Sequence, residues 1–124
     1  MATLDSFEEL DCWKSAQEVL KITYKVLAKE TVRKEFSFQD QMKRAALSVS
    51  NNIAEGFERS TTKEKLRFLS YANGSIAEVK NMLYAAKNLG FIDQSEFDST
   101  FALAEKCQSQ LKGFMRYLHS VKTS

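Results

Sequence analysis

Proline is absent from this chain of 124 residues, and glycine occurs only four times. β-Sandwiches and barrels need many turns and usually recruit proline for them, whereas a few long helices do without it. Scarce glycine likewise indicates few chain reversals. The two absences therefore favour a small number of long helices, and the chain is long enough to form one domain with a hydrophobic core.

Cysteine and histidine are also scarce. Cys12 and Cys107 are too few and too far apart in the sequence for a disulfide framework or a zinc site, so we expect both to be buried. His119 is the single histidine, and it follows no glutamate at the three-residue spacing that di-metal bundles use. No glycine-rich phosphate motif occurs. We therefore expect no catalytic site, no metal and no cofactor.

Long apolar runs are missing as well. The segment from Met1 to Leu10 is acidic and has no continuous apolar stretch, which excludes the pattern of a signal peptide. No segment approaches the roughly 20 apolar residues that cross a bilayer. We expect a cytoplasmic protein with no membrane contact.

Four segments have the apolar spacing of amphipathic helices, and each follows a capping residue. We predict helices at about 7–29, 38–57, 62–89 and 94–120. The predicted caps are Ser6, Ser37, Thr61 and Asp93, and Gly90 is the predicted stop of the third helix. Because short connections force successive helices to lie antiparallel, the sequence predicts an all-α, antiparallel up-down-up-down four-helix bundle, one domain over residues 1–124.

The first predicted helix carries two apolar stripes. A lone bundle needs one buried stripe per helix, so a second stripe predicts contact with another subunit. The stripe expected in the core is Leu10, Trp13, Leu20, Tyr24 and Leu27. The stripe expected at a subunit interface is Val19, Ile22 and Val26.

Polar residues recur at helical spacing along one edge of the second and third helices. They are Gln41, Arg44, Ser48, Asn52, Glu55 and Arg59 in the second, and Glu64, Arg67, Tyr71, Gly74 and Glu78 in the third. Two interpretations remain open: a solvated or inter-helix salt-bridge network, and a polar seam at a subunit or ligand interface. Glycine inside a helix costs roughly 1 kcal/mol relative to alanine, so Gly74, together with Ser75, predicts close approach of another backbone.

Positive charge gathers in the middle of the chain, although the whole chain has a formal net charge of only +2. Residues 41–67 contain six basic and three acidic residues, a net charge of +3. Such a bias suits an anionic partner, although mixed charges on exposed helix faces give the same pattern. The candidate nucleic-acid-binding residues are Lys43, Arg44, Arg59, Lys63, Lys65 and Arg67.

The second helix also carries a block that resembles a bacterial four-helix-bundle family, the proteins encoded in intervening sequences of 23S ribosomal RNA genes. The block runs from Gln41 to Val49 and from Asn52 to Phe57, and includes Arg59. The likeness continues through Gly74-Ser75-Ile76-Ala77-Glu78 and covers most of the chain. The accessory variability determinants of diversity-generating retroelements look related to the same family. One departure is Ser50, where the family usually has proline, so we expect a weaker kink in this helix.

This resemblance implies a homopentamer arranged around a central channel. It also implies association with RNA or DNA and, by analogy with the accessory determinants, with a reverse transcriptase. On this basis the candidate subunit contacts are Val19, Ile22, Val26, Gln41, Ser48, Asn52, Glu55, Gly74, Ser75 and Glu78. The alternative is a protein–protein scaffold or adaptor that binds no nucleic acid.

Overall fold

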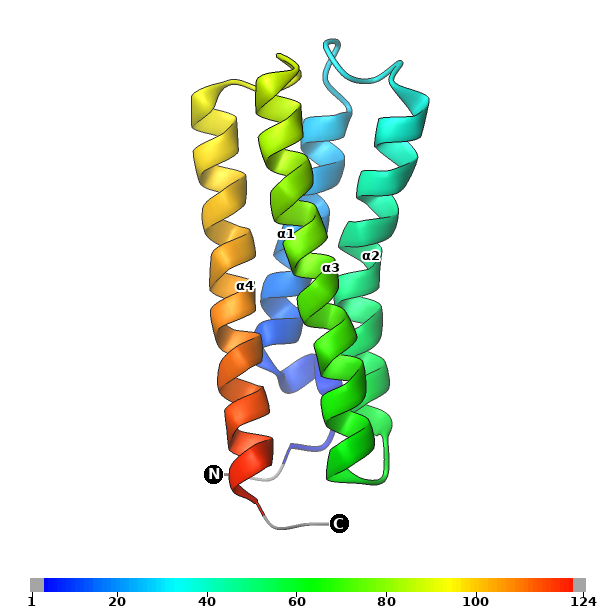
Figure 1. Cartoon of the computed structure of the whole chain (residues 1–124), viewed down its shortest axis with the longest axis vertical. Helices are drawn as coiled ribbons and strands as arrows, with labels where there is room; N and C mark the ends of the chain where they lie inside the picture. The colour runs from blue at the N-terminus through cyan, green and yellow to red at the C-terminus, as the bar shows by residue number, and fades with distance from the viewer. Residues whose placement is uncertain (1–3, 122–124) are drawn as a thin grey trace.

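A computed structural model describes residues 4–121 and shows an antiparallel bundle of four helices (Figure 1). The helices are α1 (Asp11–Leu27), α2 (Phe36–Glu58), α3 (Thr62–Asn88) and α4 (Gln94–Ser120), and a short 3-10 helix, η1 (Phe7–Glu9), precedes them. The tight α2–α3 turn and both ends of the described chain lie at one end of the bundle (Figure 1). The α1–α2 and α3–α4 connections lie at the other end. The predicted fold is confirmed.

Each helix packs against two neighbours: α1 and α3 each contact α2 and α4. The predicted apolar stripes of α2, α3 and α4 form the core between them. Met42, Val49 and Ile53 are fully buried on α2, and Leu69, Ile76 and Leu83 are fully buried on α3. Ala104 and Leu111 of α4 complete this layer. The helical spacing of these residues was therefore sufficient to identify their buried faces.

The helix boundaries differ from the prediction at α1 and α2. The Glu9 carboxylate accepts hydrogen bonds from the backbone N–H groups of Asp5 and Ser6, at 3.1 and 3.3 Å, but these bonds close the 3-10 turn. The chain then extends at Leu10, and α1 begins only at Asp11. α2 begins at Phe36 behind Glu35, so the prediction of Ser37 as a cap is wrong and Ser37 lies inside the helix.

The face that α1 buries also differs from the prediction. Val19 and Val26 lie in the core of their own bundle, so the interpretation of these two residues as a subunit contact is wrong. Tyr24, which was expected in the core, is exposed. The buried face of α1 combines the small residues Ala16 and Thr23 with Val19, Val26 and Leu27, so it takes members of both predicted stripes. Only Ile22 of the predicted interface stripe remains partly exposed.

The predicted end of α3 is confirmed in detail. Gly90 has a φ of 77°, the left-handed conformation that glycine adopts without a Cβ clash. The backbone N–H of Gly90 donates to the carbonyl of Lys87 at 3.1 Å, and that of Phe91 donates to the carbonyl of Ala86 at 2.8 Å. These two bonds form a Schellman motif, which satisfies helix carbonyls that would otherwise lack partners.

Candidate interface on the α2–α3 face

Part of the polar seam joins α2 to α3 by hydrogen bonds. The Ser75 hydroxyl lies 2.8 Å from the Ser48 hydroxyl, and the Asn52 side-chain amide donates to the same Ser48 oxygen at 2.9 Å. Closer to the start of α2, the Gln41 amide donates to the Glu78 carboxylate at 3.4 Å. The Ser75–Ser48 and Gln41–Glu78 bonds join the two helices, whereas the Asn52–Ser48 bond lies within α2. Together the serine and asparagine bonds satisfy partly buried polar groups.

The arginines of the seam form ion pairs within their own helices, so no inter-helix arginine network exists among residues 4–121. Arg59 pairs with Glu55 at 2.5 Å and Arg67 pairs with Glu64 at 3.0 Å. Arg44 pairs in the same way with Asp40, also at 3.0 Å. Such exposed intrahelical pairs contribute little to stability, and each neutralises part of the positive charge of this face.

The six candidate nucleic-acid-binding residues do not form one patch. Arg59, Lys63, Lys65 and Arg67 lie at the α2–α3 turn. Lys43 and Arg44 lie about four helical turns away along α2, or about 22 Å at 1.5 Å per residue. The Lys65 ammonium group already donates one hydrogen bond, to the backbone carbonyl of Phe57 at 2.6 Å, so it has fewer N–H groups left for a phosphate.

Two arginines and two aromatic residues lie together at this turn and form an arginine–aromatic cluster. This cluster was not predicted from the sequence. The guanidinium groups of Arg59 and Arg67 lie 4.3 and 5.1 Å from the centroid of the Phe68 ring. The Phe68 ring meets the Tyr71 ring edge-on at a centroid distance of 5.6 Å, and Tyr71 is 49% exposed. The signal was present in the run Arg67-Phe68 followed by Tyr71, since residues one helical turn apart share a face.

Gly74 lies on the exposed side of α3. Apart from its two chain neighbours and the backbone of its own helix, no described atom lies within 4 Å of the position that a Cβ on Gly74 would occupy, so no close helix contact among residues 4–121 explains this glycine. The close approach of α2 and α3 occurs at Gly56 instead, where a Cβ would lie 3.1 Å from the Lys65 carbonyl and 3.3 Å from Leu69. Exposed Leu47 and Tyr84 lie on the same pair of helices as Gly74.

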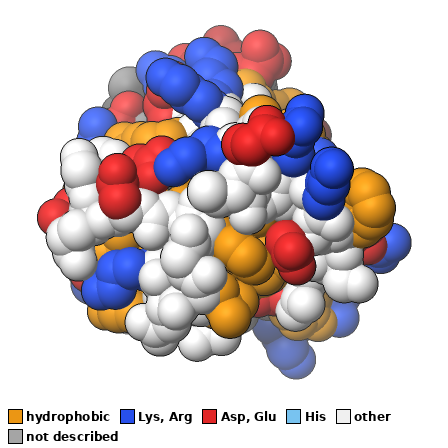
Figure 2. All heavy atoms as spheres, turned by 90° about the horizontal axis from the view of Figure 1, so that it is seen from above, with side chains coloured by type: hydrophobic (Ala, Val, Ile, Leu, Met, Phe, Trp, Pro, Cys, Tyr) orange, Lys and Arg blue, Asp and Glu red, His pale blue; other side chains and the backbone are white. Residues whose placement is uncertain are grey.

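The opposite end of the bundle carries no patch of one charge. Figure 2 views this end and shows lysine, arginine and acidic side chains interspersed around hydrophobic ones. Phe36, the first residue of α2, and Leu89, which follows α3, are exposed hydrophobic residues at this end. The basic candidates at the α2–α3 turn therefore lie at the end facing away from this view.

The groups that could carry chemistry are either buried or isolated. Cys12 and Cys107 are buried free thiols, and burial raises their pKa to about 11 and about 12 respectively. His119 is exposed near the end of α4. Within the described part of the chain, no three His, Cys, Asp or Glu side chains lie together as a metal site would require. None of the helices in that part is long and apolar enough to cross a bilayer.

By its fold, the chain is a four-helix-bundle protein, and it carries a polar seam on its α2–α3 face. The sequence model of the 23S rRNA-intervening sequence proteins matches residues 8–113, and the chain belongs to this family. A crystal structure of a protein of unknown function from the S23 ribosomal protein family of Bacteroides thetaiotaomicron has the same fold. The two are 20% identical with a TM-score of 0.76, over 85% of this chain and 98% of that one. No curated protein matches the chain in sequence.

Proposed function

We propose that the chain is a non-catalytic assembly module whose copies form a ring, a homopentamer by resemblance to its family, through the outer face of α3. The observation that carries this proposal is the open space around Gly74. A glycine in the middle of a long helix costs roughly 1 kcal/mol relative to alanine, and nothing inside the chain offsets that cost. Close approach of a second backbone would offset it.

The residues around Gly74 suit a protein partner. Leu47 and Gly74 each precede one of the two hydrogen-bonded serines, Ser48 and Ser75, so they lie at the same level of the bundle. Leu47, Tyr71 and Tyr84 are all exposed, and tyrosine is enriched where proteins meet. A ring closes through a heterologous contact, so this face would pack against a different surface of the next copy.

The mass of the particle in solution tests this proposal. Light scattering at micromolar concentrations should give several chain masses for the wild type and about one chain mass for Gly74→Leu, with the helical circular dichroism unchanged. The matched control is Ala102→Leu, which adds the same side chain on the exposed face of α4 and should leave the assembly intact. A monomeric wild type, or a Gly74→Leu variant that still assembles, would refute the proposal.

The arginine–aromatic cluster favours a second candidate function, contact with nucleic acid at the α2–α3 turn. Guanidinium groups contact phosphates, and exposed rings accept stacked bases. The charge at this turn is modest, because four basic residues face Glu55, Glu58 and Glu64, a net charge of +1. A ring would repeat this charge in every copy, and phosphate contacts add up.

A titration of labelled structured RNA, followed by fluorescence anisotropy at about 50 mM and about 200 mM salt, tests the second candidate. Binding should be tighter at the lower salt and should weaken in Arg59→Gln/Arg67→Gln. Lys34→Gln, at the opposite end of the bundle, should bind as the wild type does. If no binding appears at the lower salt, the assembly would be a scaffold or adaptor for another protein, and a reverse transcriptase is the partner that the family resemblance suggests.

A further inference from the structure

The outer side of α2 carries a row of residues that is separate from the polar seam. They recur at helical spacing, share one face and all reach the surface; they are Lys43, Leu47, Asn51, Ala54 and Glu58, the α2 stripe. Consecutive helical residues point about 100° apart, and Leu47 directly precedes Ser48, which bonds to α3. The Lys43 ammonium lies 5.0 Å from the centroid of the Tyr24 ring of α1. The α2 stripe therefore faces the side of α1 and not that of α3.

A hollow opens in the α2 stripe close to the α2–α3 turn. Its volume is about 450 Å³, and it lies between Phe7 of η1 and the α2 residues Asn51, Ala54, Glu55 and Glu58. Phe7 and Ala54 supply apolar surface, and both ionisable residues of the lining are acidic. A hollow of this composition suits an aromatic side chain that stands beside a basic one.

The outer face of α3 presents such residues. Arg67, Tyr71, Gly74 and Glu78 are spaced by four, three and four residues, so they share one face, and all four are exposed. The Glu78 carboxylate accepts the Gln41 amide of α2 at 3.4 Å, so this α3 stripe lies on the α2–α3 side of the bundle. It contains the unexplained glycine.

The two stripes match in height along the bundle. Ser48 meets Ser75 and Gln41 meets Glu78, which fixes the antiparallel register of α2 and α3. By this register Lys43 lies level with Glu78, Leu47 with Gly74, Asn51 with Tyr71, and Ala54 with Arg67. In a ring whose axis runs along the bundle every copy stands at the same height, so the same levels hold between neighbouring copies.

We infer that the α3 stripe of one copy packs against the α2 stripe of the next copy. This inference rests on the ring proposed above and names the second surface that its contact requires. Leu47 packs into the open space at Gly74, where a larger α3 residue would hold the two helices apart. Tyr71 enters the hollow beside Phe7, where its hydroxyl can bond to the exposed amide of Asn51.

The charges at the two ends of this contact are complementary. Glu78 and Lys43 lie level, and neither forms an ion pair within the described chain. At the other end Arg67 stands within one helical turn of the level of Glu58, which also lacks an ion pair there. Each stripe changes sign from one end to the other, so only the antiparallel register brings opposite charges together.

The positions of the two stripes also suit a closed ring. The α2 stripe lies on the α1–α2 side and the α3 stripe on the α2–α3 side. Adjacent sides of a four-helix bundle stand about 90° apart, so each copy is turned relative to the one before it. A heterologous contact at such an angle closes after about four or five copies.

Reversing the charges across one end of the contact tests the inference. Glu78→Lys and Lys43→Glu each place like charges face to face, so each variant alone should need roughly tenfold more protein to assemble in light scattering. An equimolar mixture should assemble where neither variant does alone, because the two reversed stripes then meet. Lys106→Glu, an exposed reversal on α4, should assemble as the wild type does. A mixture that assembles no better than its components would overturn the inference.

A disulfide between chains identifies the contact independently. Oxidation of a mixture of Asn51→Cys and Tyr71→Cys chains should give a mixed dimer on a non-reducing gel, since the two native cysteines are buried. A mixture of Lys106→Cys and Tyr71→Cys should give none. If the wild type assembles but shows neither this cross-link nor the rescue by mixing, the inference fails and the ring stands. A monomeric wild type removes both.

Discussion

At the scale of single residues, the two cysteines face each other across the α1–α4 seam. The Cys107 thiol lies 3.5 Å from the backbone carbonyl of Cys12. Burial removes both thiols from water and disfavours their charged forms, which raises the pKa of Cys12 to about 11 and that of Cys107 to about 12, from 9.0. Both thiols are therefore neutral and poorly nucleophilic at physiological pH.

This burial predicts a loss of stability in alkaline solution. In the unfolded chain both thiols ionise near pH 9, whereas in the folded chain they stay protonated up to about pH 11 and 12. Their contribution is complete below pH 9 and is lost as the pH rises through the folded values, at about 1.4 kcal/mol per thiol and pH unit. Urea unfolding at pH 8 to 11 should show this decline. The double variant Cys12→Ala/Cys107→Ala should decline less steeply; an equal slope would contradict the assignment.

We predict that replacing Thr23 or Thr100 by valine raises the stability of the protein, which is unusual for a buried position. Both are fully buried, and neither hydroxyl has a hydrogen-bond partner among residues 4–121. Valine keeps the β-branched shape and removes the unpaired polar group, so each Thr→Val variant should gain about 1 kcal/mol in the free energy of unfolding. Urea denaturation measures this change. A loss of stability would show that the hydroxyl forms a bond in solution, with water for example.

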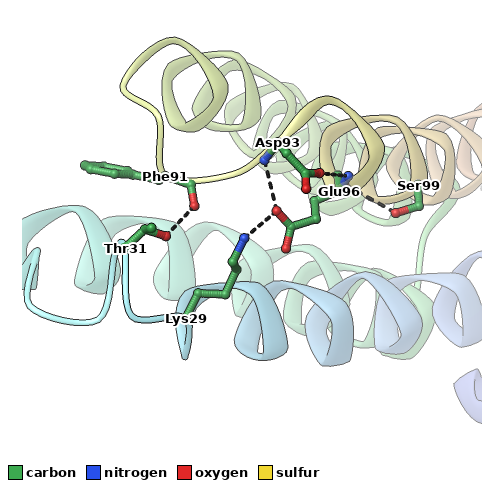
Figure 3. Close-up of polar contacts among 6 residues, drawn as sticks. All are labelled: Lys29, Thr31, Phe91, Asp93, Glu96 and Ser99. Atoms are coloured by element: carbon green, nitrogen blue, oxygen red, sulfur yellow. Dashed lines mark hydrogen bonds and ion pairs between the residues drawn. The ribbon is translucent and has the colours of Figure 1, made fainter.

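At the scale of elements, substitutions at the predicted N-caps of α2 and α4 test how much each residue contributes to stability. The Asp93 carboxylate accepts the backbone N–H of Glu96 at 2.8 Å, and Glu96 returns a bond to the backbone N–H of Asp93 (Figure 3). Asp93→Ala should therefore cost about 1 kcal/mol of stability. Ser37→Ala should cost nothing or stabilise slightly, because Ser37 lies inside α2 and alanine is the better helix former. Thermal unfolding of the two variants should separate them clearly.

Two of the three helical glycines, Gly56 and Gly74, should respond in opposite directions to alanine. Gly56→Ala places a methyl group 3.1 Å from the Lys65 carbonyl and 3.3 Å from Leu69, and forcing the helices apart should cost about 1–3 kcal/mol. Gly74→Ala meets open space within the chain and should stabilise the isolated bundle by about 1 kcal/mol. Urea denaturation at concentrations where the chain is monomeric measures both. A destabilised Gly74→Ala monomer would mean that this glycine serves its own bundle.

At the scale of the whole molecule, the connections decide how the chain folds. Three of the four packed helix pairs are joined by a short connection, whereas α1 and α4 pack together from opposite ends of the sequence. Helical bundles with mostly local contacts fold within milliseconds. The chain has no proline, so no X–Pro isomerisation delays refolding. Stopped-flow refolding at low protein concentration should show no phase of tens of seconds. A slow phase that persists on dilution would contradict this expectation.

Local sequence determined most of this architecture. The Thr61 and Asp93 caps, the stop at Gly90 and the apolar spacing of α2, α3 and α4 each act within a few residues, so they can be read from the chain directly. The polar seam was also predictable as a row of side chains. Its hydrogen-bond partners were not, because the bond between Ser48 and Ser75 depends on the register of two helices.

Only the tertiary structure decided which face of α1 is buried and which basic residues lie together. The spacing along α1 allowed two stripes, but the buried face takes Leu10 and Leu27 from one and Val19 and Val26 from the other, and it leaves Tyr24 exposed. Arg44 and Arg59 share one polar face in sequence, but the length of α2 separates them along the bundle. The absence of proline, by contrast, indicated long uninterrupted helices from the sequence alone. Proline breaks a helix through its own ring and its missing N–H, so its effect does not depend on the tertiary contacts of the residue.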